Sequence, residues 1–299
     1  MIHTRGYIRR RGKNSFQVAV WTGKDHKGRD LYYYETVRGD DVYLIQSIGH
    51  RPNDEFMELL FWVDAFKRAS VNSVTAIMPF FSYAKGDKKD EPRVSIRARV
   101  CADALEAAGV DRVVTMDLHS PQIQGFFHVP VDHLFAMPVL CRSIQRTSNL
   151  VVVSPDAGFA KRARKYAEHL DAPVAIGDKM RRGHDEQAEV VEIIGDVAGL
   201  DALIVDDFTI TCGTLVDVAR ALQDRGARGI RACLSHCVLN EEGLKALENS
   251  PISELITTDT VESKTVEKCQ KIKIASVAEL FADVINRVHY RDSVSTLFE

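Results

Sequence analysis

From residue 41 onward, short apolar segments alternate with segments whose apolar residues recur at helical spacing. Several apolar segments are continuous runs, which is typical of parallel strands buried on both faces. Strands that alternate with helices predict an α/β doubly wound fold. We expect the strands at 42–48, 74–81, 112–118, 150–156, 173–179, 202–208, 230–236, 254–259 and 272–276.

The intervening segments carry ordinary helix signals. Residues 54–69 place their large apolar side chains on one stripe, and Asn53 is the expected N-cap. The helices expected at 95–108 and 215–225 both stop at a glycine. There are too many strands for one small sheet, so we expect two domains that meet near residue 136.

Residues 5–36 follow a different pattern. Tyr7–Asn14, Phe16–Trp21 and Leu31–Thr36 read as a small antiparallel β-meander. Residues 1–38 hold nine Lys or Arg and three Asp or Glu, a net charge of +6, against −9 for the remainder. A hairpin grafted onto the first sheet is the favoured interpretation. The alternative is a DNA-binding arm, because the segment weakly resembles the arm-type domain of phage-type tyrosine recombinases.

The composition excludes several classes of protein. The chain has 299 residues, of which 45% are hydrophobic and 27% charged, and no apolar run approaches the roughly 18 residues of a membrane helix. The first residues lack the apolar core of a signal peptide. Six scattered cysteines predict reduced thiols in a cytoplasmic protein. Cys233 and Cys237 flank His236, a spacing that admits a metal, although buried core thiols are favoured.

The segment Leu203–Leu215 carries the clearest chemistry. Two adjacent carboxylates, Asp206 and Asp207, end a strand, and a turn of hydroxyls and glycine, Thr211–Thr214, leads directly into a helix. Backbone N–H groups at such a turn favour a phosphate, and paired carboxylates accept hydrogen bonds from vicinal hydroxyls or hold a metal. Together these groups suit the two ends of ribose 5-phosphate. The alternative is an ordinary strand-to-helix turn with a capping box from Thr214 to Asp217.

This segment resembles the phosphoribosyl pyrophosphate motif shared by phosphoribosyltransferases and ribose-phosphate pyrophosphokinases. Residues 37–299 resemble the pyrophosphokinases nearly end to end, through runs at 37–39, 41–47, 53–70, 115–119, 122–127, 151–156 and 293–298. The resemblance implies two doubly wound phosphoribosyltransferase-like (type I) domains with mostly parallel sheets. The first domain would comprise residues 39–135, to which the tail 285–299 returns, and the second would comprise residues 136–284. An atypical β segment at 1–38 precedes both domains.

The resemblance also implies an activity and a site. The activity is the Mg²⁺-dependent transfer of the diphosphoryl group of ATP to the C1 hydroxyl of ribose 5-phosphate, in a cytoplasmic homo-oligomer, a hexamer in the family. ATP would bind through Lys85, Asp87, Lys88 and His119, and the metal through His119 and Asp156. Catalysis would rest on His119 and on Lys179 and Arg181, which the resemblance places in a flexible loop at Asp178–Arg182 that continues through Gly183–Gln187. Ribose 5-phosphate would bind through Asp206, Asp207, Thr211, Cys212, Gly213 and Thr214.

The chain departs from the family at several of these positions. Lys85 and Lys88 stand where the family usually has arginines, Gly86 replaces a glutamine, and Ile210 replaces a third acid. The family's Phe-Ser-Asp-Gly-Glu adenine loop is missing, and Lys24–Gly28 occupies its place. These departures keep open a catalytically impaired or regulatory paralogue that co-assembles with an active subunit. A phosphoribosyltransferase is disfavoured because no base-binding hood is recognisable, and a DNA-linked role would rest on residues 1–38.

Overall fold

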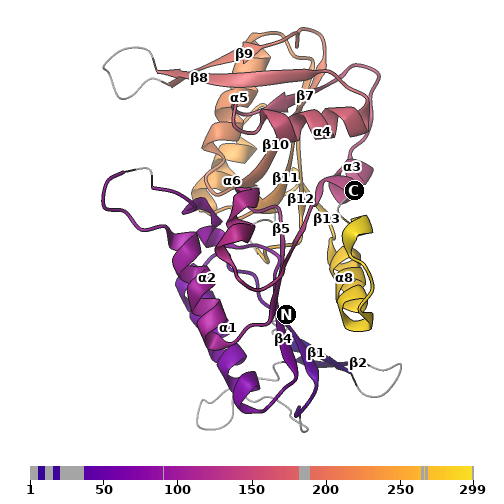
Figure 1. Ribbon diagram of the computed structural model, residues 1–299. Coiled ribbons are helices and arrows are strands. Elements are labelled where there is room, and N and C mark those ends of the chain that lie inside the picture. Colours follow the sequence, from indigo (N-terminus) through magenta and orange to yellow (C-terminus); the bar gives the residue numbers. More distant parts are fainter. Residues whose placement is uncertain are drawn as a thin grey trace. The chain divides into compact units, whose positions relative to one another are not determined.

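The computed structural model describes residues 6–10, 16–20, 37–89, 91–181, 189–263, 266 and 269–297 (Figure 1). Contacts between residues divide the chain into two compact units. Unit 1 comprises Met1–Phe135 with Leu280–Glu299, and unit 2 comprises Ala136–Glu279. The α/β fold with mostly parallel sheets that the sequence predicts is confirmed in both units.

Unit 1 is built on a sheet in the order β2-β1-β3-β4-β5-β6. Its strands are β1 (Gly6–Arg10), β2 (Phe16–Val20), β3 (Asp41–Ile45), β4 (Ser73–Met78), β5 (Arg112–Met116) and β6 (Val131–Leu134). The strands from β3 to β6 run parallel, so their carboxyl ends share one edge of the sheet. Its helical segments are α1 (Pro52–Arg68), η1 (Ser82–Lys85), α2 (Arg97–Ala108), η2 (Pro121–Phe126), most of α8 (Ala278–Tyr290) and η3 (Ser295–Leu297).

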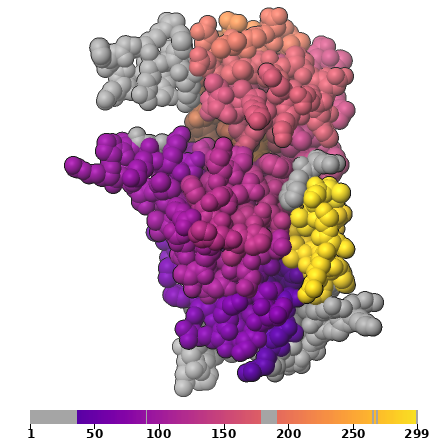
Figure 2. Space-filling model, viewed as in Figure 1, coloured from indigo at the N-terminus to yellow at the C-terminus, as the bar shows by residue number. Residues whose placement is uncertain are grey.

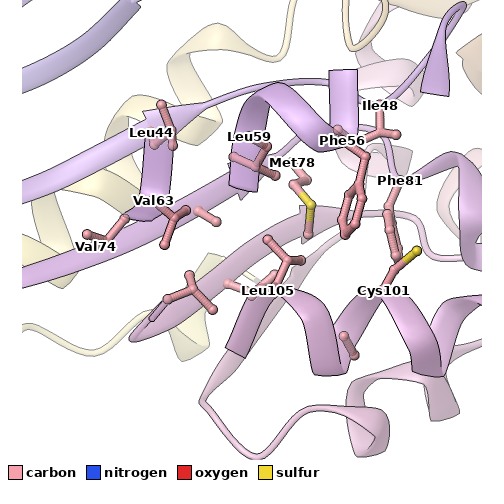
Figure 3. Close-up of a cluster of buried hydrophobic side chains, with 14 of the residues drawn as sticks. Leu44, Ile48, Phe56, Leu59, Val63, Val74, Met78, Phe81, Cys101 and Leu105 are labelled. Atoms are coloured by element: carbon pink, nitrogen blue, oxygen red, sulfur yellow. The ribbon is translucent and has the colours of Figure 1, made fainter. Parts of the chain in front are cut away.

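Helices cover both faces of this sheet. On one face, α1 and α2 pack against alternate strand residues to form a core that includes Leu44, Leu59 and Leu105 (Figure 3). On the opposite face, the buried ring of Tyr43 in β3 meets His289 of α8 edge to face, with 6.2 Å between the ring centroids. Successive side chains of a strand point to opposite faces, which explains why Leu44 and Tyr43 contact different helices.

The amino-terminal strands extend this sheet at its β3 edge. β1 pairs antiparallel with β3, with Tyr7 opposite Leu44, and β2 pairs antiparallel with β1. The first two strands of the expected meander therefore belong to the sheet of unit 1. The third expected strand, Leu31–Thr36, lies outside the described residues.

Unit 2 is built on a sheet in the order β13-β12-β11-β10-β7-β8-β9. Its strands are β7 (Leu150–Ser154), β8 (Val174–Arg181), β9 (Glu189–Ile194), β10 (Asp201–Thr209), β11 (Gly229–Cys237), β12 (Glu254–Thr258) and β13 (Ile272–Ala275). The pairings are parallel except that of β8 with β9. Its helices are α3 (Met137–Ser143), α4 (Ala160–Leu170), α5 (Gly213–Asp224) and α6 (Glu241–Glu248).

The central strands of unit 2 contain the continuous apolar runs that were predicted, such as Leu150–Val153 in β7 and Ala202–Val205 in β10. Val151 and Val153 of β7 face a core that α5 and α6 complete, whereas the intervening Val152 is equally buried on the other face. α4 packs against β7 and α3 packs against α4. Helices on both faces of a parallel sheet make this unit doubly wound as well.

Two kinds of sequence expectation were wrong in detail. β6 was not predicted because it has only four residues, and β9 was not predicted because it forms through its pairing with β8. Asn53 is not an N-cap, because α1 begins at Pro52 behind Arg51, and the Asn53 side chain accepts a hydrogen bond from the Tyr83 hydroxyl. Within the described residues, none of the helices combines the length and apolar character that crossing a membrane requires.

Candidate active site

Two carboxylates mark the carboxyl end of β10, the central strand of unit 2. Asp207 is buried and Asp206 is partly buried, and each carboxylate accepts the N–H of the following residue at 2.9 Å. The parallel neighbours β7 and β11 flank this strand, so the pair lies at the ligand-binding edge that parallel sheets provide. We call residues 206–214 the acidic cradle.

The turn of the acidic cradle presents open amides at the start of α5. Cys212 has a left-handed backbone with φ 60°, and its N–H donates to the Thr209 hydroxyl at 3.1 Å. α5 begins at Gly213, and its N-cap makes no side-chain hydrogen bond. The first N–H groups of a helix have no partner within the helix, so those of Gly213 and Thr214 are available to an anion. The alternative of a capping box from Thr214 is therefore wrong.

α6 supports this turn from a distant part of the sequence. The Asn240 N–H donates to the Ile210 carbonyl at 3.2 Å, and the Asn240 side chain caps α6 by accepting the Gly243 N–H at 2.8 Å. A Cβ atom at Gly243 would lie 2.5 Å from the Ile210 carbonyl oxygen and 3.0 Å from the Thr211 Cα. Contact that close requires glycine, so Gly243 lets the turn rest directly on the helix.

The acidic cradle concentrates negative charge. The pKa of Asp206 is raised well above its usual value, first because burial disfavours the charged form and then because Asp207 is negatively charged. The charge of Asp156, at the end of the neighbouring strand β7, raises the pKa of Asp206 further. A cation close to Asp206 would offset these negative charges.

Asp156 also has a structural part. Its Oδ1 accepts the Phe159 N–H at 2.9 Å, and its carbonyl accepts the Ser154 hydroxyl at 2.7 Å. These bonds fix the turn that leads into α4. The side chain is nevertheless exposed, and its second carboxylate oxygen remains for a ligand.

Lys179 and Arg181 lie in β8, on the other side of β7 from the acidic cradle. The expectation of a loop beginning at Asp178 was wrong, because β8 continues through Arg181 and pairs with β9. Lys179 is opposite Val191 and Arg181 is opposite Glu189 in the register. The expected continuation of the loop, Gly183–Gln187, lies outside the described residues.

In unit 1, the predicted ATP-binding residues follow the neighbouring strands β4 and β5. Residues 82–89 and 91–93, which we call the lysine loop, project from their unit before α2 (Figures 1 and 2). Lys85 and Lys88 are exposed in it, whereas Gly86 between them is buried. The Gly86 N–H donates to the Tyr83 carbonyl at 2.9 Å, and the Gly86 carbonyl accepts the Ala98 N–H of α2 at 3.1 Å.

His119 lies on the turn after β5, next to the lysine loop in the order of strands. Asp117 in this turn has a positive φ of 40°, which is uncommon for a residue other than glycine. The Leu118 N–H donates at 2.9 Å to Nε2 of His133, a buried residue of β6. His133 therefore acts as an acceptor that fixes the turn. Sequence reasoning missed it because β6 itself was not predicted.

The predicted site residues thus gather in two sets. Lys85, Asp87, Lys88 and His119 follow adjacent strands of unit 1. Asp156, Lys179, Arg181 and the acidic cradle lie on the adjacent strands β8, β7 and β10 of unit 2. Ile210 is 46% exposed within the acidic cradle, and the six cysteines are buried free thiols.

Comparison with known proteins identifies both units. Residues 24–109 match the model of the N-terminal domain of ribose phosphate pyrophosphokinase, and residues 180–299 match that of the phosphoribosyl synthetase-associated domain. A ribose-phosphate pyrophosphokinase of Clostridium acetobutylicum is 47% identical over 269 residues, which cover 89% of this chain and 84% of that protein. One from Caldanaerobacter subterraneus subsp. tengcongensis is 49% identical over 267 residues, or 88% and 84% of the two chains.

A solved structure agrees with these matches. The crystal structure of phosphoribosylpyrophosphate synthetase from Mycobacterium smegmatis has a TM-score of 0.84 at 35% identity and covers 92% of both chains. The chain therefore belongs to the ribose-phosphate pyrophosphokinase family.

Proposed function

We propose that the protein transfers the diphosphoryl group of ATP to the C1 hydroxyl of ribose 5-phosphate, which gives phosphoribosyl pyrophosphate and AMP. The acidic cradle is the observation that carries this proposal. It joins a pair of carboxylates to uncapped helix amides within nine residues of one unit. Relatives that are 47% and 49% identical to this chain over most of both sequences are named ribose-phosphate pyrophosphokinases.

The acidic cradle suits the two ends of the acceptor sugar. The 5-phosphate would accept hydrogen bonds from the amides of Gly213 and Thr214, aided by the hydroxyls of Thr211 and Thr214. Asp207 and Asp206 would accept hydrogen bonds from the ribose hydroxyls. Held at both ends, the sugar presents its C1 hydroxyl in one orientation, which lowers the entropic cost of the transfer.

The donor nucleotide would bind to the charged groups of unit 1. Lys85, Lys88 and His119 offer cationic or hydrogen-bonding groups for a triphosphate, and Asp87 accepts hydrogen bonds. Lys179 and Arg181 of unit 2 would stabilise the negative charge that develops during diphosphoryl transfer. Since the reaction breaks and forms bonds to phosphorus, charge stabilisation and orientation supply most of the catalysis.

The residues present fit a magnesium ion. Burial and the negative charges of Asp207 and Asp156 raise the pKa of Asp206, so a cation nearby would favour the ionised carboxylate. Carboxylate oxygens are the ligands that Mg²⁺ prefers, usually together with substrate phosphates. We infer that Asp156 and His119 hold the ion, as the family resemblance implies. Bound Mg²⁺ would neutralise phosphate charge and so favour attack at phosphorus.

A second function is favoured by Ile210. This exposed apolar side chain stands where the resemblance places an acid, and it adds no hydrogen bond to a sugar. A regulatory subunit that binds phosphorylated ligands and stimulates an active relative would show the same features. The first proposal, that of an active enzyme, also includes assembly as a homo-oligomer, a hexamer in the family, and a cytoplasmic location.

The experiment measures AMP formation from ATP while ribose 5-phosphate and Mg²⁺ are left out in turn. We expect purified protein to form AMP from ATP only when ribose 5-phosphate and Mg²⁺ are both present, and the matched control Asp207→Asn to need more ribose 5-phosphate for the same rate. AMP formation that ignores ribose 5-phosphate would contradict the proposal. No AMP from the chain alone, together with stimulation of an added active family member, would establish the regulatory function.

A further inference from the structure

Gly86 of the lysine loop lies in close contact with the side chain of Arg97 in α2. A Cβ atom at Gly86 would lie 2.8 Å from both the Cβ and the Nε atoms of Arg97, the first residue of α2. The backbone at Gly86 has φ −93° and ψ 44°, and this negative φ does not demand glycine. Space is therefore the reason for glycine here, because the Arg97 side chain folds back across the backbone of the loop.

Arg97 is held there without a partner. Among the residues that the structure describes, it makes no hydrogen bond or ion pair, and its side chain is exposed. Its neighbour Arg99, by contrast, forms an ion pair with Asp103 at 2.7 Å and donates to the Phe126 carbonyl. Arg97 is thus an available guanidinium beside Lys85 and Lys88.

The position of Arg97 is also electrostatically unfavourable in the free protein. The first turn of α2 has no acidic residue, and its N-cap, Ile96, makes no side-chain hydrogen bond. A cation at the positive end of a helix dipole is destabilising, and the charges of two nearby lysines add to this. A polyanionic ligand would relieve the repulsion.

We propose that Arg97 is a further nucleotide-binding residue, whose guanidinium contacts the triphosphate of the donor across Gly86. This inference rests on the proposed function and extends it to a residue outside the loop proper. Lysine binds phosphate as a point charge, whereas the planar fork of arginine donates two parallel hydrogen bonds. Arg97 thereby supplies the bidentate contact that Lys85 and Lys88 cannot make.

Equilibrium binding tests this role independently of turnover. The ligands are Mg²⁺ with α,β-methylene-ATP, which cannot be cleaved at the transferred bond, and inorganic triphosphate, both titrated calorimetrically. We expect Arg97→Ala to weaken both about 10- to 100-fold, as loss of a charge-assisted hydrogen bond predicts. Arg97→Lys should fall between parent and Arg97→Ala, and Gly86→Ala, which displaces Arg97, should also weaken both.

Controls separate this role from general effects on the unit. Arg68→Ala removes an exposed arginine of α1 and should leave nucleotide binding within about twofold of the parent. Ribose 5-phosphate binding should be unchanged in every variant. Nucleotide binding by Arg97→Ala within twofold of the parent, or a loss confined to the nucleotide and absent with triphosphate, would overturn the proposal.

The result is distinguishable from a failure of the proposed function. A parent protein that binds nucleotide without forming AMP would contradict the proposed function and still allow the Arg97 test. A parent that forms AMP while Arg97→Ala binds nucleotide normally would contradict the Arg97 role alone.

Discussion

The acidic cradle of unit 2 and the lysine loop of unit 1 present their binding groups in different ways. The acidic cradle uses backbone amides and buried or partly buried carboxylates, and α6 holds its turn in place. The lysine loop carries its charges on the exposed side chains of Lys85 and Lys88, and the exposed Arg97 of α2 lies beside the loop. We infer that the first region selects one sugar phosphate by shape, whereas the second attracts a polyanion by charge.

The largest expected effect comes from the charges of β8. Lys179→Ala and Arg181→Ala should each lower turnover about 10²- to 10³-fold, the usual loss when a transition-state donor is removed. Nucleotide affinity in the ground state should change far less. Steady-state kinetics and calorimetric titration check this, with Arg225→Ala as an exposed control in the same unit. Equal losses in affinity and turnover would show a static binding role instead.

Asp207→Asn tests the acidic cradle at its most buried carboxylate. The loss of a charge-assisted hydrogen bond to a sugar hydroxyl should cost about 1.5–3 kcal/mol, or roughly 10- to 150-fold in the KM for ribose 5-phosphate. The KM for ATP should stay close to the parent value. Unchanged dependence on ribose 5-phosphate would remove Asp207 from the sugar site.

Gly243→Ala tests whether shape governs the acidic cradle. The added Cβ would meet the Ile210 carbonyl oxygen at 2.5 Å, so the turn must move, at a cost of about 1–3 kcal/mol. We expect a raised KM for ribose 5-phosphate and little change for ATP. Gly125→Ala is the matched control, because a Cβ there meets no atom within 4 Å. If both variants change the KM for ribose 5-phosphate equally, the close contact at Gly243 does not affect function.

The smallest expected effect is a gain in stability from Asp206→Asn. The folded-state pKa of Asp206 lies above the usual value of 3.8, so the folded protein binds more protons than the unfolded chain. The ionised carboxylate therefore costs stability, and this cost appears as the pH rises above 3.8. Asp206→Asn should raise stability at pH 8 by about 0.5–2 kcal/mol, a range common for stabilising substitutions.

Thermal unfolding without added cations, at pH 8 and at pH 5, measures this gain. The gain should be larger at pH 8 and should shrink when Mg²⁺ is added to the parent protein. Asp196→Asn replaces an exposed acid of the same unit and serves as the control. A destabilised Asp206→Asn variant at pH 8 would show that the ionised carboxylate is stabilising.

The sequence predicted those features of the fold that depend on residues close together along the chain. The continuous apolar run before Asp206 specified a buried parallel strand, and the hydroxyl-rich turn after it specified a helix amino terminus. Contacts between distant segments were not predictable. Gly243 meets Ile210, and Arg97 folds across Gly86, only because the fold brings these segments together. β9 was missed for the same reason. Its own residues do not distinguish a strand from a loop, and they form a strand because they pair with β8.

The most direct test of the central claim is to follow the phosphorus atoms of the reaction. Phosphorus NMR of the protein with ATP, ribose 5-phosphate and Mg²⁺ should show a new diphosphate bonded to the sugar C1, growing in step with AMP. Asp207→Asn should slow both signals together. Formation of ADP or orthophosphate in place of AMP, or AMP without a C1 diphosphate, would contradict the assignment of the acidic cradle as the acceptor site for diphosphoryl transfer.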